Sequence, residues 1–412
     1  MGSHPIRVQR RLGPRLIALS RGDRATGIGL SAATVVALLW ANVAPGSYHH
    51  VWQLVPSTPH LVGLRFSLRD WTNQGLMTVF FAVVGLEIRR EMSSGELASW
   101  RRASIPVAAA LGGMIAPALI YAAIVHGSTG SQGWGIPMAT DVAFAVGALA
   151  LVGARTSPRL RVFLMTLAVA DDIMSIVVIV CFYSRHLDVT PLLVGVTCIL
   201  VMGAVEAVRP VWIGPQLLLG VVGWLALARG GVEAAVIGVA IGAMALPSPV
   251  GGTWARLRGP RGWEQRLEPY LTLGILPVFA VANTGVSLRQ FTFSANGALT
   301  VFVAVVVARV IGKPAGIALT AWALRTVPSG RYDPRLAHRH ILGVGALASV
   351  GFTVPLLVIR AALPDGPLTD SATLGLLAGS LLGALSGIIV FRSGTPRPGA
   401  TVVKPLSAAE PA

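Results

Sequence analysis

Two adjacent aspartates lie inside an apolar stretch of this chain. Asp171 and Asp172 come about halfway along an apolar run that begins before Leu167. An aspartate at the centre of a membrane costs roughly 2.5 to 3.5 kcal/mol on insertion scales, so each one needs a partner or a function. Adjacent residues of a helix point about 100° apart, so the two carboxylates are not expected to share one partner equally. We expect one to meet a fixed charge and the other to face a cation path.

Lys313 and Asp141 are further charges within apolar runs. Lys313 is the best fixed partner for one of the two aspartates, and no other intramembrane cation is expected to neutralise Asp172. A functional role for Asp172 is therefore favoured. Asp141 ends the stretch 135–141, which should interrupt a helix. Since helix N-termini favour an anion and C-termini a cation, Asp141 and Lys313 are expected to balance the exposed helix ends, and for Asp141 this structural role is preferred.

The same residues offer the oxygen ligands that small hard cations prefer. Thr140 and Asp141 supply a hydroxyl and a carboxylate beside those of Asp171 and Asp172, and an interrupted helix adds carbonyls. Removal from water favours the neutral form of a carboxylate, so such a group can hold a proton near neutral pH. A proton and a sodium ion can then compete for the same oxygens, which is an exchange mechanism. Beyond the transported ions, no cofactor is expected.

Composition places these residues in a membrane. Of the 412 residues, 54% are apolar and only 12% are charged, a share far below that of soluble domains. Apolar stretches near the ~20 residues that span a bilayer recur from end to end and leave no room for a soluble domain. We predict a basic N-terminal segment at 1–24, one transmembrane domain at 25–391 and a disordered cytoplasmic tail at 392–412.

Twelve spans account for the apolar runs, so the predicted fold is an all-α polytopic membrane protein with about twelve helices. The fourth span is interrupted at 135–141 and the eleventh around Gly343, Gly345, Gly351 and Pro355, with Thr353 between them. If spans 3 to 5 and 10 to 12 are inverted repeats, matching interruptions indicate a transporter's binding site. Glycines that only permit close helix packing are the alternative. The expected spans are 25–44, 72–90, 104–125, 134–153, 160–183, 191–208, 212–228, 232–246, 268–287, 297–325, 338–361 and 373–391.

The net charge of +16 is distributed in short basic patches between spans, which indicates topology rather than nucleic-acid binding. By the positive-inside rule both termini are cytoplasmic, in the inner (cell) membrane. The first apolar run, 25–43, is long for the core of a cleavable signal peptide, so a retained helix is preferred. Cys181 and Cys198 lie inside spans and are assigned to packing. The basic patches are the six arginines of 7–24, Arg89/Arg90/Arg101/Arg102, Arg155/Arg159/Arg161, Arg256/Arg258/Arg261/Arg266 and Arg331/Arg335/Arg339.

The segment 45–70 between the first two spans contains an alternating pattern. Val62, Leu64, Phe66 and Leu68 alternate with less apolar residues, which is typical of a strand. We predict a short extracytoplasmic β-hairpin, whose free edge offers a route to a homodimer. A strand that lies only on its own protein is the alternative.

Short motifs along the chain are found in one family, in the same order. They are Gly75-Leu76-Met77, Phe80-Phe81, Gly85-Leu86-Glu87, the run 139–145, Ala170-Asp171-Asp172, Leu276-Pro277, Ala282-Asn283, Gly312-Lys313-Pro314 and Gly351-Phe352-Thr353. In these motifs the sequence resembles the NhaA-type bacterial sodium/proton antiporters. The resemblance covers residues 75–353 directly, and the spacing covers the remaining spans.

The resemblance implies roles for individual residues. It implies that Asp172 is the principal cation and proton carrier, that Asp171 pairs with Lys313, and that Thr140 and Asp141 lie where two broken helices cross. It implies two protons exchanged per sodium or lithium ion, which would regulate cytoplasmic pH and sodium. Glu87 and Glu264 match positions of a cytoplasmic funnel associated with pH control; an ordinary charged helix end is the alternative for both.

Three departures from the family pattern concern pH response and gating. Gln74 replaces an aspartate before Gly-Leu-Met, Glu233 replaces a histidine after Gly-Val, and Val354-Pro355 replaces Met-Ser. A histidine changes charge near pH 6.5, so the chain has lost one candidate pH switch at position 233. The pH response is then expected to depend on Glu87, Glu264, Glu233 and the competition at Asp172.

Two other classes of membrane protein use similar residues. Paired aspartates also serve intramembrane proteases and prenyltransferases, but a second Asp-rich motif for diphosphate and the contexts of an aspartic dyad are missing from this sequence. A channel is a weaker rival, which transport against a gradient would exclude. The expected function is secondary transport by a protein that is not an enzyme.

Overall fold

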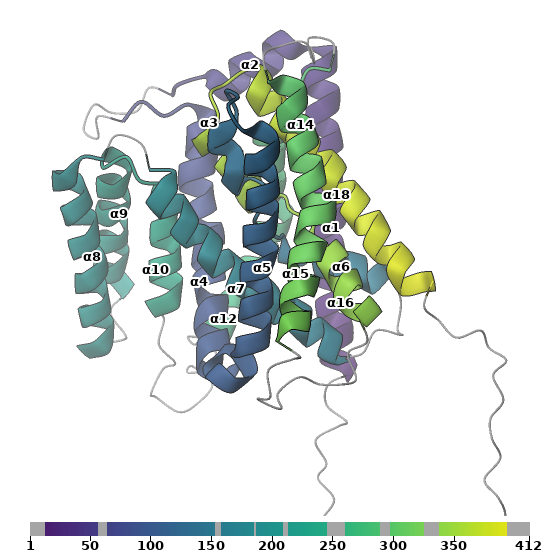
Figure 1. The fold of residues 1–412 in the computed structure, drawn as a ribbon. Helices are drawn as coiled ribbons and strands as arrows, with labels where there is room; N and C mark the ends of the chain where they lie inside the picture. The colour runs from purple at the N-terminus through teal and green to yellow at the C-terminus, as the bar shows by residue number, and fades with distance from the viewer. Residues whose placement is uncertain are drawn as a thin grey trace, which may run out of the picture.

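A computed structural model describes residues 13–56, 64–152, 158–184, 187–208, 213–244, 260–288, 297–324 and 338–393 (Figure 1). All regular structure within these ranges is helical. Short 3₁₀ segments lie at η2 (Glu96–Ala98), η3 (Ser131–Gly135) and η4 (Ala234–Val236). The helices are α1 (Gly13–Val43), α2 (Pro45–Gln53), α3 (Leu68–Asp70), α4 (Met77–Ser94), α5 (Trp100–Val125), α6 (Val142–Val152), α7 (Pro158–Phe182), α8 (Val189–Val208), α9 (Ile213–Arg229), α10 (Ile237–Met244), α12 (Pro260–Tyr270), α13 (Leu276–Thr284), α14 (Ala298–Val307), α15 (Lys313–Ala323), α16 (His338–Ala348), α17 (Thr353–Ala362) and α18 (Pro367–Ser393).

Three π-helical segments join neighbouring helices into longer rods. The segment η1 (Trp71–Leu76) connects α3 to α4, η5 (Leu271–Ile275) connects α12 to α13, and η6 (Ala308–Gly312) connects α14 to α15. A π-helical turn shifts the backbone hydrogen bonds by one residue and is frequent at functional sites. The segment η6 comes directly before Lys313, so the turn that carries this lysine is irregular.

Six of the described helical segments are long and apolar enough to cross a membrane. The pair α16 and α17, bent by 53° at its break, passes the same test as one further span. The chain is therefore an integral membrane protein, whereas the expected number of twelve spans stays a prediction. The six segments are Thr26–Val43, Ala103–Val125, Leu160–Phe182, Val189–Glu206, Ala298–Ala323 and Pro367–Ser393.

Both expected interruptions are present as breaks in helices. Residues 136–141 separate η3 from α6, and residues 349–352 separate α16 from α17. Gly343 and Gly345, which the sequence suggested as part of the second break, lie inside α16. Pro355 lies in the first turn of α17, where the missing N–H costs no hydrogen bond. The second break is thus shorter than expected and lies at Ser349–Phe352.

Close helix packing positions the rod that carries Lys313. Helix α5 and helix α15 approach so closely that a Cβ atom on Gly112 would collide with Thr320, and one on Gly316 would collide with the Gly112 carbonyl. Small residues permit this approach in membrane helices. Helices α8 and α9 form a pair at one side of the bundle, beside α10 (Figure 1).

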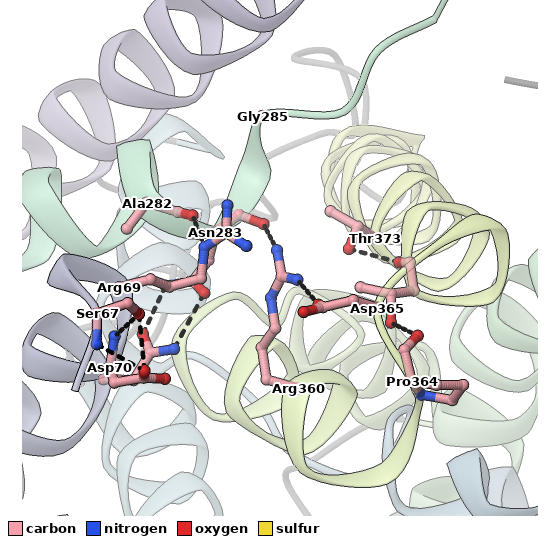
Figure 2. Close-up of polar contacts among 12 residues, drawn as sticks. Ser67, Arg69, Asp70, Ala282, Asn283, Gly285, Arg360, Pro364, Asp365 and Thr373 are labelled. Carbon is pink, nitrogen blue, oxygen red and sulfur yellow. Dashed lines mark hydrogen bonds and ion pairs between the residues drawn. The ribbon is translucent and has the colours of Figure 1, made fainter. Parts of the chain in front are cut away.

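The C-terminal end of α13 is held by side chains from three other elements, and Figure 2 shows two of them, Arg69 and Arg360. Helix C-termini leave carbonyls without partners, and buried ones need donors. Arg360 of α17 also forms an ion pair with Asp365 at 2.9 Å, so this network ties α17 to α13. The donors are the Tyr48 hydroxyl to the Val281 carbonyl at 2.7 Å, Arg69 Nε to the Ala282 carbonyl at 3.1 Å, and Arg360 Nη2 to the Asn283 carbonyl at 3.5 Å.

The segment expected to form a hairpin differs in its described part. Residues 45–53 form helix α2, residues 64–67 are irregular, and Leu68 begins α3, so these residues contain no strand. Residues 57–63 lie outside the described ranges, as do 1–12 and 394–412. Both cysteines are free; Cys198 is buried as expected, whereas Cys181 is exposed on α7.

Candidate functional site

The two helix breaks cross each other through direct hydrogen bonds. The Asp141 backbone N–H donates to the Val350 carbonyl at 2.9 Å, and the Thr140 hydroxyl donates to the Ala348 carbonyl at 2.9 Å. Thr140 and Asp141 are both buried. The crossing therefore brings two helix N-termini and two helix C-termini to one place, with partial positive and negative charges respectively.

Asp141 lies at both N-termini of this crossing. One carboxylate oxygen, Oδ1, accepts a hydrogen bond from the Phe144 backbone N–H in the first turn of α6, at 3.3 Å. The other, Oδ2, accepts from the Thr353 hydroxyl at the start of α17, at 3.2 Å. An anion is stabilised at such a position by the N–H groups and by the helix dipoles.

Lys313 lies against Asp171 rather than Asp172. The Lys313 Nζ atom is 2.8 Å from Asp171 Oδ2, and both side chains are almost fully buried, with exposed fractions of 0% and 1%. The same ammonium group donates to the Met138 carbonyl in the first helix break. Lys313 thus connects the crossing to helix α7.

Asp172 has a different environment although it is adjacent in sequence. It is buried, with 7% of the residue exposed, and no described residue donates a hydrogen bond to its carboxylate or forms an ion pair with it. Asp171 Oδ1 and Ser175 Oγ, one turn along α7, also have no hydrogen-bond partner in the described part of the chain. One turn of α7 therefore presents several buried oxygens that are free to bind a cation or a proton.

A second buried cation, Arg309, corrects one expectation. From the sequence we expected no intramembrane cation besides Lys313. Arg309 in η6 is a second one, because its side chain is fully buried. It donates to backbone carbonyls of both breaks and makes no hydrogen bond to Asp172, which stays without an ion pair among the described residues. The available signal was its position four residues before Lys313, on the same helix face.

Two of the three candidates for pH response are joined by an arginine. Arg90 donates from Nη1 to both carboxylate oxygens of Glu264, at 2.6 and 2.8 Å, and from Nη2 to Glu87 at 3.5 Å. These three side chains are only partly buried, in the second half of α4 and the middle of α12. From the sequence, Arg90 was expected only to help set the membrane topology. Its position one helical turn after Glu87 was the signal for this ion pair.

The third candidate, Glu233, lies beside another departure from the family pattern. It is partly buried directly before η4, and its Oε1 atom has no hydrogen-bond partner in the described structure. Gln74 Oε1 accepts from the Ala234 backbone N–H at 2.7 Å. The two substitutions that the sequence showed separately are thus neighbours in space.

This contact predicts that substitutions at the two positions are not additive. We expect Gln74→Asp to destabilise the protein, because it places a second acid beside partly buried Glu233, and we expect Glu233→His in the same chain to restore stability. Residues in contact typically show interaction energies of about 0.5 to 3 kcal/mol. Thermal unfolding of the two single variants and the double variant in detergent measures this energy. Gln74→Asn is the matched neutral control, and additive effects would show that the pair is not coupled.

Comparison with known proteins relates this geometry to a family. The protein family described as Na+/H+ antiporter 1 matches residues 18–391 of the chain. A Na(+)/H(+) antiporter NhaA 2 of Pseudomonas putida is 36% identical over 411 residues, covering 89% of this chain and 90% of that protein. A Na(+)/H(+) antiporter NhaA 2 of Sorangium cellulosum is 39% identical, covering 89% and 87%, and a NhaA of Oleidesulfovibrio alaskensis is 34% identical, covering 95% and 96%.

Proposed function

We propose, because this chain belongs to the Na+/H+ antiporter 1 family, that its exchange of sodium ions for protons takes place at Asp172. The chain is a secondary transporter and not an enzyme. The observation that carries the assignment is the state of the Asp172 carboxylate, which is buried but free of hydrogen bonds from the described residues. Such a group can take either a proton or a sodium ion, and each one excludes the other.

The neighbouring oxygens complete the proposed cation site. Asp171 Oδ1 and Ser175 Oγ are buried without partners in the described residues, and both lie within one helical turn of Asp172. Thr140 gives its hydroxyl hydrogen to a carbonyl, which leaves its oxygen lone pairs available, and Asp141 lies next to it. Sodium and lithium ions both suit this all-oxygen set. No resident metal or cofactor is part of the proposal.

We assign the second proton of each cycle to the Asp171–Lys313 pair. One carboxylate that releases one proton for one sodium ion would move no net charge. A buried pair in direct contact titrates as a unit, so protonation of Asp172 and of the pair can be coupled. Two protons would then enter for each sodium ion that leaves, and the exchange would be driven by the membrane potential as well as by the pH gradient.

The topology is proposed from the charge pattern and the crossing. Two interrupted helices that meet at their breaks support the inverted-repeat arrangement of twelve spans, with both termini cytoplasmic in the inner membrane. A homodimer through the 45–70 segment is also proposed. Its support is the exposed apolar surface of Leu54 and Val55 after α2.

Sodium-driven proton flux in inverted membrane vesicles tests the proposed function. We expect addition of sodium to release protons from acidified vesicles that contain the protein, and not from vesicles without it. The flux should persist when sodium is moved against its own gradient by an imposed pH gradient. A channel would only dissipate the sodium gradient, and a protein with neither activity would leave the vesicle pH unchanged.

Glu264→Gln is expected to shift the pH profile of exchange without lowering its maximum. The substitution removes one negative charge beside Arg90, and nearby carboxylates then bind protons less tightly. Protons are released at a lower pH, so activation should move in the acid direction by a fraction of a pH unit. The shift should shrink at high salt because the cluster is partly exposed.

The measurement is sodium-driven exchange between about pH 6 and 9, a range that brackets histidine titration. Glu268→Gln is the matched control, because Glu268 is an exposed glutamate one turn further along the same helix. Equal profiles for Glu264→Gln and the wild type would show that Glu264 is an ordinary charged helix end.

A further inference from the structure

We propose that Arg309 is a positioning residue of the exchange reaction. In this proposal, its permanent charge holds the two helix breaks together, so that Lys313 can pair with Asp171 and take part in proton exchange. The proposal rests on the proposed function of the Asp171–Lys313 pair. It extends that function by dividing two tasks, the neutralisation of helix ends and the handling of a proton, between two cations.

The hydrogen bonds of Arg309 reach both helix breaks. Nε donates to the Ser349 carbonyl at 2.9 Å, just after the end of α16. Nη2 donates to the Ala139 carbonyl at 3.1 Å and Nη1 to the Ile136 carbonyl at 3.4 Å, both in the break before α6. The Ser349 carbonyl directly follows the C-terminus of α16, where a cation is stabilising, and residues 136 and 139 offer carbonyls of the irregular segment between η3 and α6. One fully buried guanidinium group therefore bridges two segments more than 200 residues apart.

The surrounding structure is shaped to admit this side chain. The Ser349 hydroxyl donates back to the Arg309 carbonyl at 2.7 Å, so Arg309 and Ser349 hold each other through two hydrogen bonds. A Cβ atom on Gly351 would collide with Arg309 Nη2 and with the Ala139 carbonyl. The glycine of the Gly351-Phe352-Thr353 motif thus leaves the space that the guanidinium group occupies.

Charges are distributed over the crossing in a complementary way. Asp141 lies at the two N-termini, whereas Arg309 lies at the C-terminus of α16 and at the carbonyls of the first break. The acids that act on Arg309 are Asp171 and Asp141, and the other nearby cation is Lys313. With Arg309 on the carbonyls of residues 136, 139 and 349, Lys313 keeps a single carbonyl contact, to Met138, and pairs with Asp171.

The two cations differ in what they can do chemically. An arginine side chain stays charged in proteins and presents five N–H donors in a planar fork, which suits several fixed carbonyls. A lysine side chain is a compact ammonium group that can lose its proton when it is buried. If Lys313 loses its charge during the cycle, Arg309 still neutralises the carbonyls of residues 136, 139 and 349. The crossing then keeps its geometry in every protonation state.

Two substitutions at position 309 test this division of tasks. Arg309→Met keeps a long side chain without charge, and we expect sodium-driven exchange to fall more than tenfold across pH 6 to 9. Arg309→Lys restores a cation that can lose its proton on burial, so we expect exchange near pH 7 but an alkaline limit displaced to lower pH than in the wild type. A side chain that only fills space would give Arg309→Lys the wild-type pH profile.

A measurement without transport separates this proposal from the proposed function. We expect Arg309→Lys in detergent to melt below the wild type at pH 7, and the difference to narrow as the pH rises to 9, whatever the transport activity is. A buried lysine releases its proton more readily than a lysine of the unfolded chain, so the unfolded state binds more protons and stability rises with pH. This readout also decides the matter if Arg309→Met does not fold. Gly351→Ala, which should displace the guanidinium group while keeping its charge, is expected to lose exchange as well. Wild-type pH dependence of melting in Arg309→Lys, or wild-type exchange in Arg309→Met, would overturn the proposal.

Discussion

Replacement of Asp172 with asparagine is expected to abolish sodium/proton exchange while leaving the fold intact. Asparagine has nearly the same shape but cannot release a proton or offer a negative charge to sodium. Because Asp172 has no ion pair among the described residues, its neutralisation removes a buried charge rather than breaking an interaction. An aspartate at the membrane centre costs roughly 2.5 to 3.5 kcal/mol, so the melting temperature should stay the same or rise.

Sodium-induced proton release from inverted vesicles measures this effect, and it should fall to the level of vesicles that lack the protein. Glu206→Gln is the matched control. Glu206 is an acid of α8 with the same 7% exposure, and it accepts a hydrogen bond from Gln216. We expect Glu206→Gln to exchange normally. Normal rates in Asp172→Asn vesicles would show that another group carries the ions.

The sequence was most informative for residues that are energetically costly in an apolar run. Asp171, Asp172 and Lys313 interrupt apolar runs, and their cost in a membrane is independent of the rest of the fold. The first helix break could be located for a similar reason, since residues 135–141 combine glycine, proline and an aspartate. These features are local, so they could be interpreted without knowledge of what lies next to them.

Glycine residues were less informative because one residue type serves two purposes. Gly343 and Gly345 were counted with the second break, but both lie inside α16. A Cβ atom on Gly345 would lie 2.8 Å from the Pro314 Cα atom, and one on Gly343 would lie 2.6 Å from the Phe391 ring. They permit close packing, which was the alternative interpretation. Only Gly351, at the break itself, makes room for a functional side chain.

Arg309 was missed because its partners are distant in sequence. Its place within the apolar span Ala298–Ala323 marked Arg309 as costly in a membrane, but the sequence did not indicate what it binds. Its acceptors are backbone carbonyls of residues 136, 139 and 349, which no side-chain pattern marks. The crossing of two helix breaks creates this site, and the crossing itself is a tertiary feature.

Lys313→Ala is expected to destabilise the protein and to make any remaining exchange electroneutral. Removal of one partner of a buried ion pair typically costs about 3 to 5 kcal/mol, because the other charge is left without compensation. Asp171 would lose its 2.8 Å contact and would keep its proton throughout the cycle. Asp172 would then exchange one proton for one sodium ion, with no net movement of charge.

The measurement is the membrane potential generated per sodium ion in proteoliposomes, together with thermal unfolding. The double variant Asp171→Asn/Lys313→Ala should recover much of the lost stability, since no buried charge is left unpaired, but its exchange should stay electroneutral. Asp365→Ala is a matched control for loss of an ion pair. The Asp365 side chain is 78% exposed, so its loss should cost no more than about 1 kcal/mol and should leave the charge movement unchanged. If Lys313→Ala moves the same charge per sodium ion as the wild type, the second proton does not come from this pair.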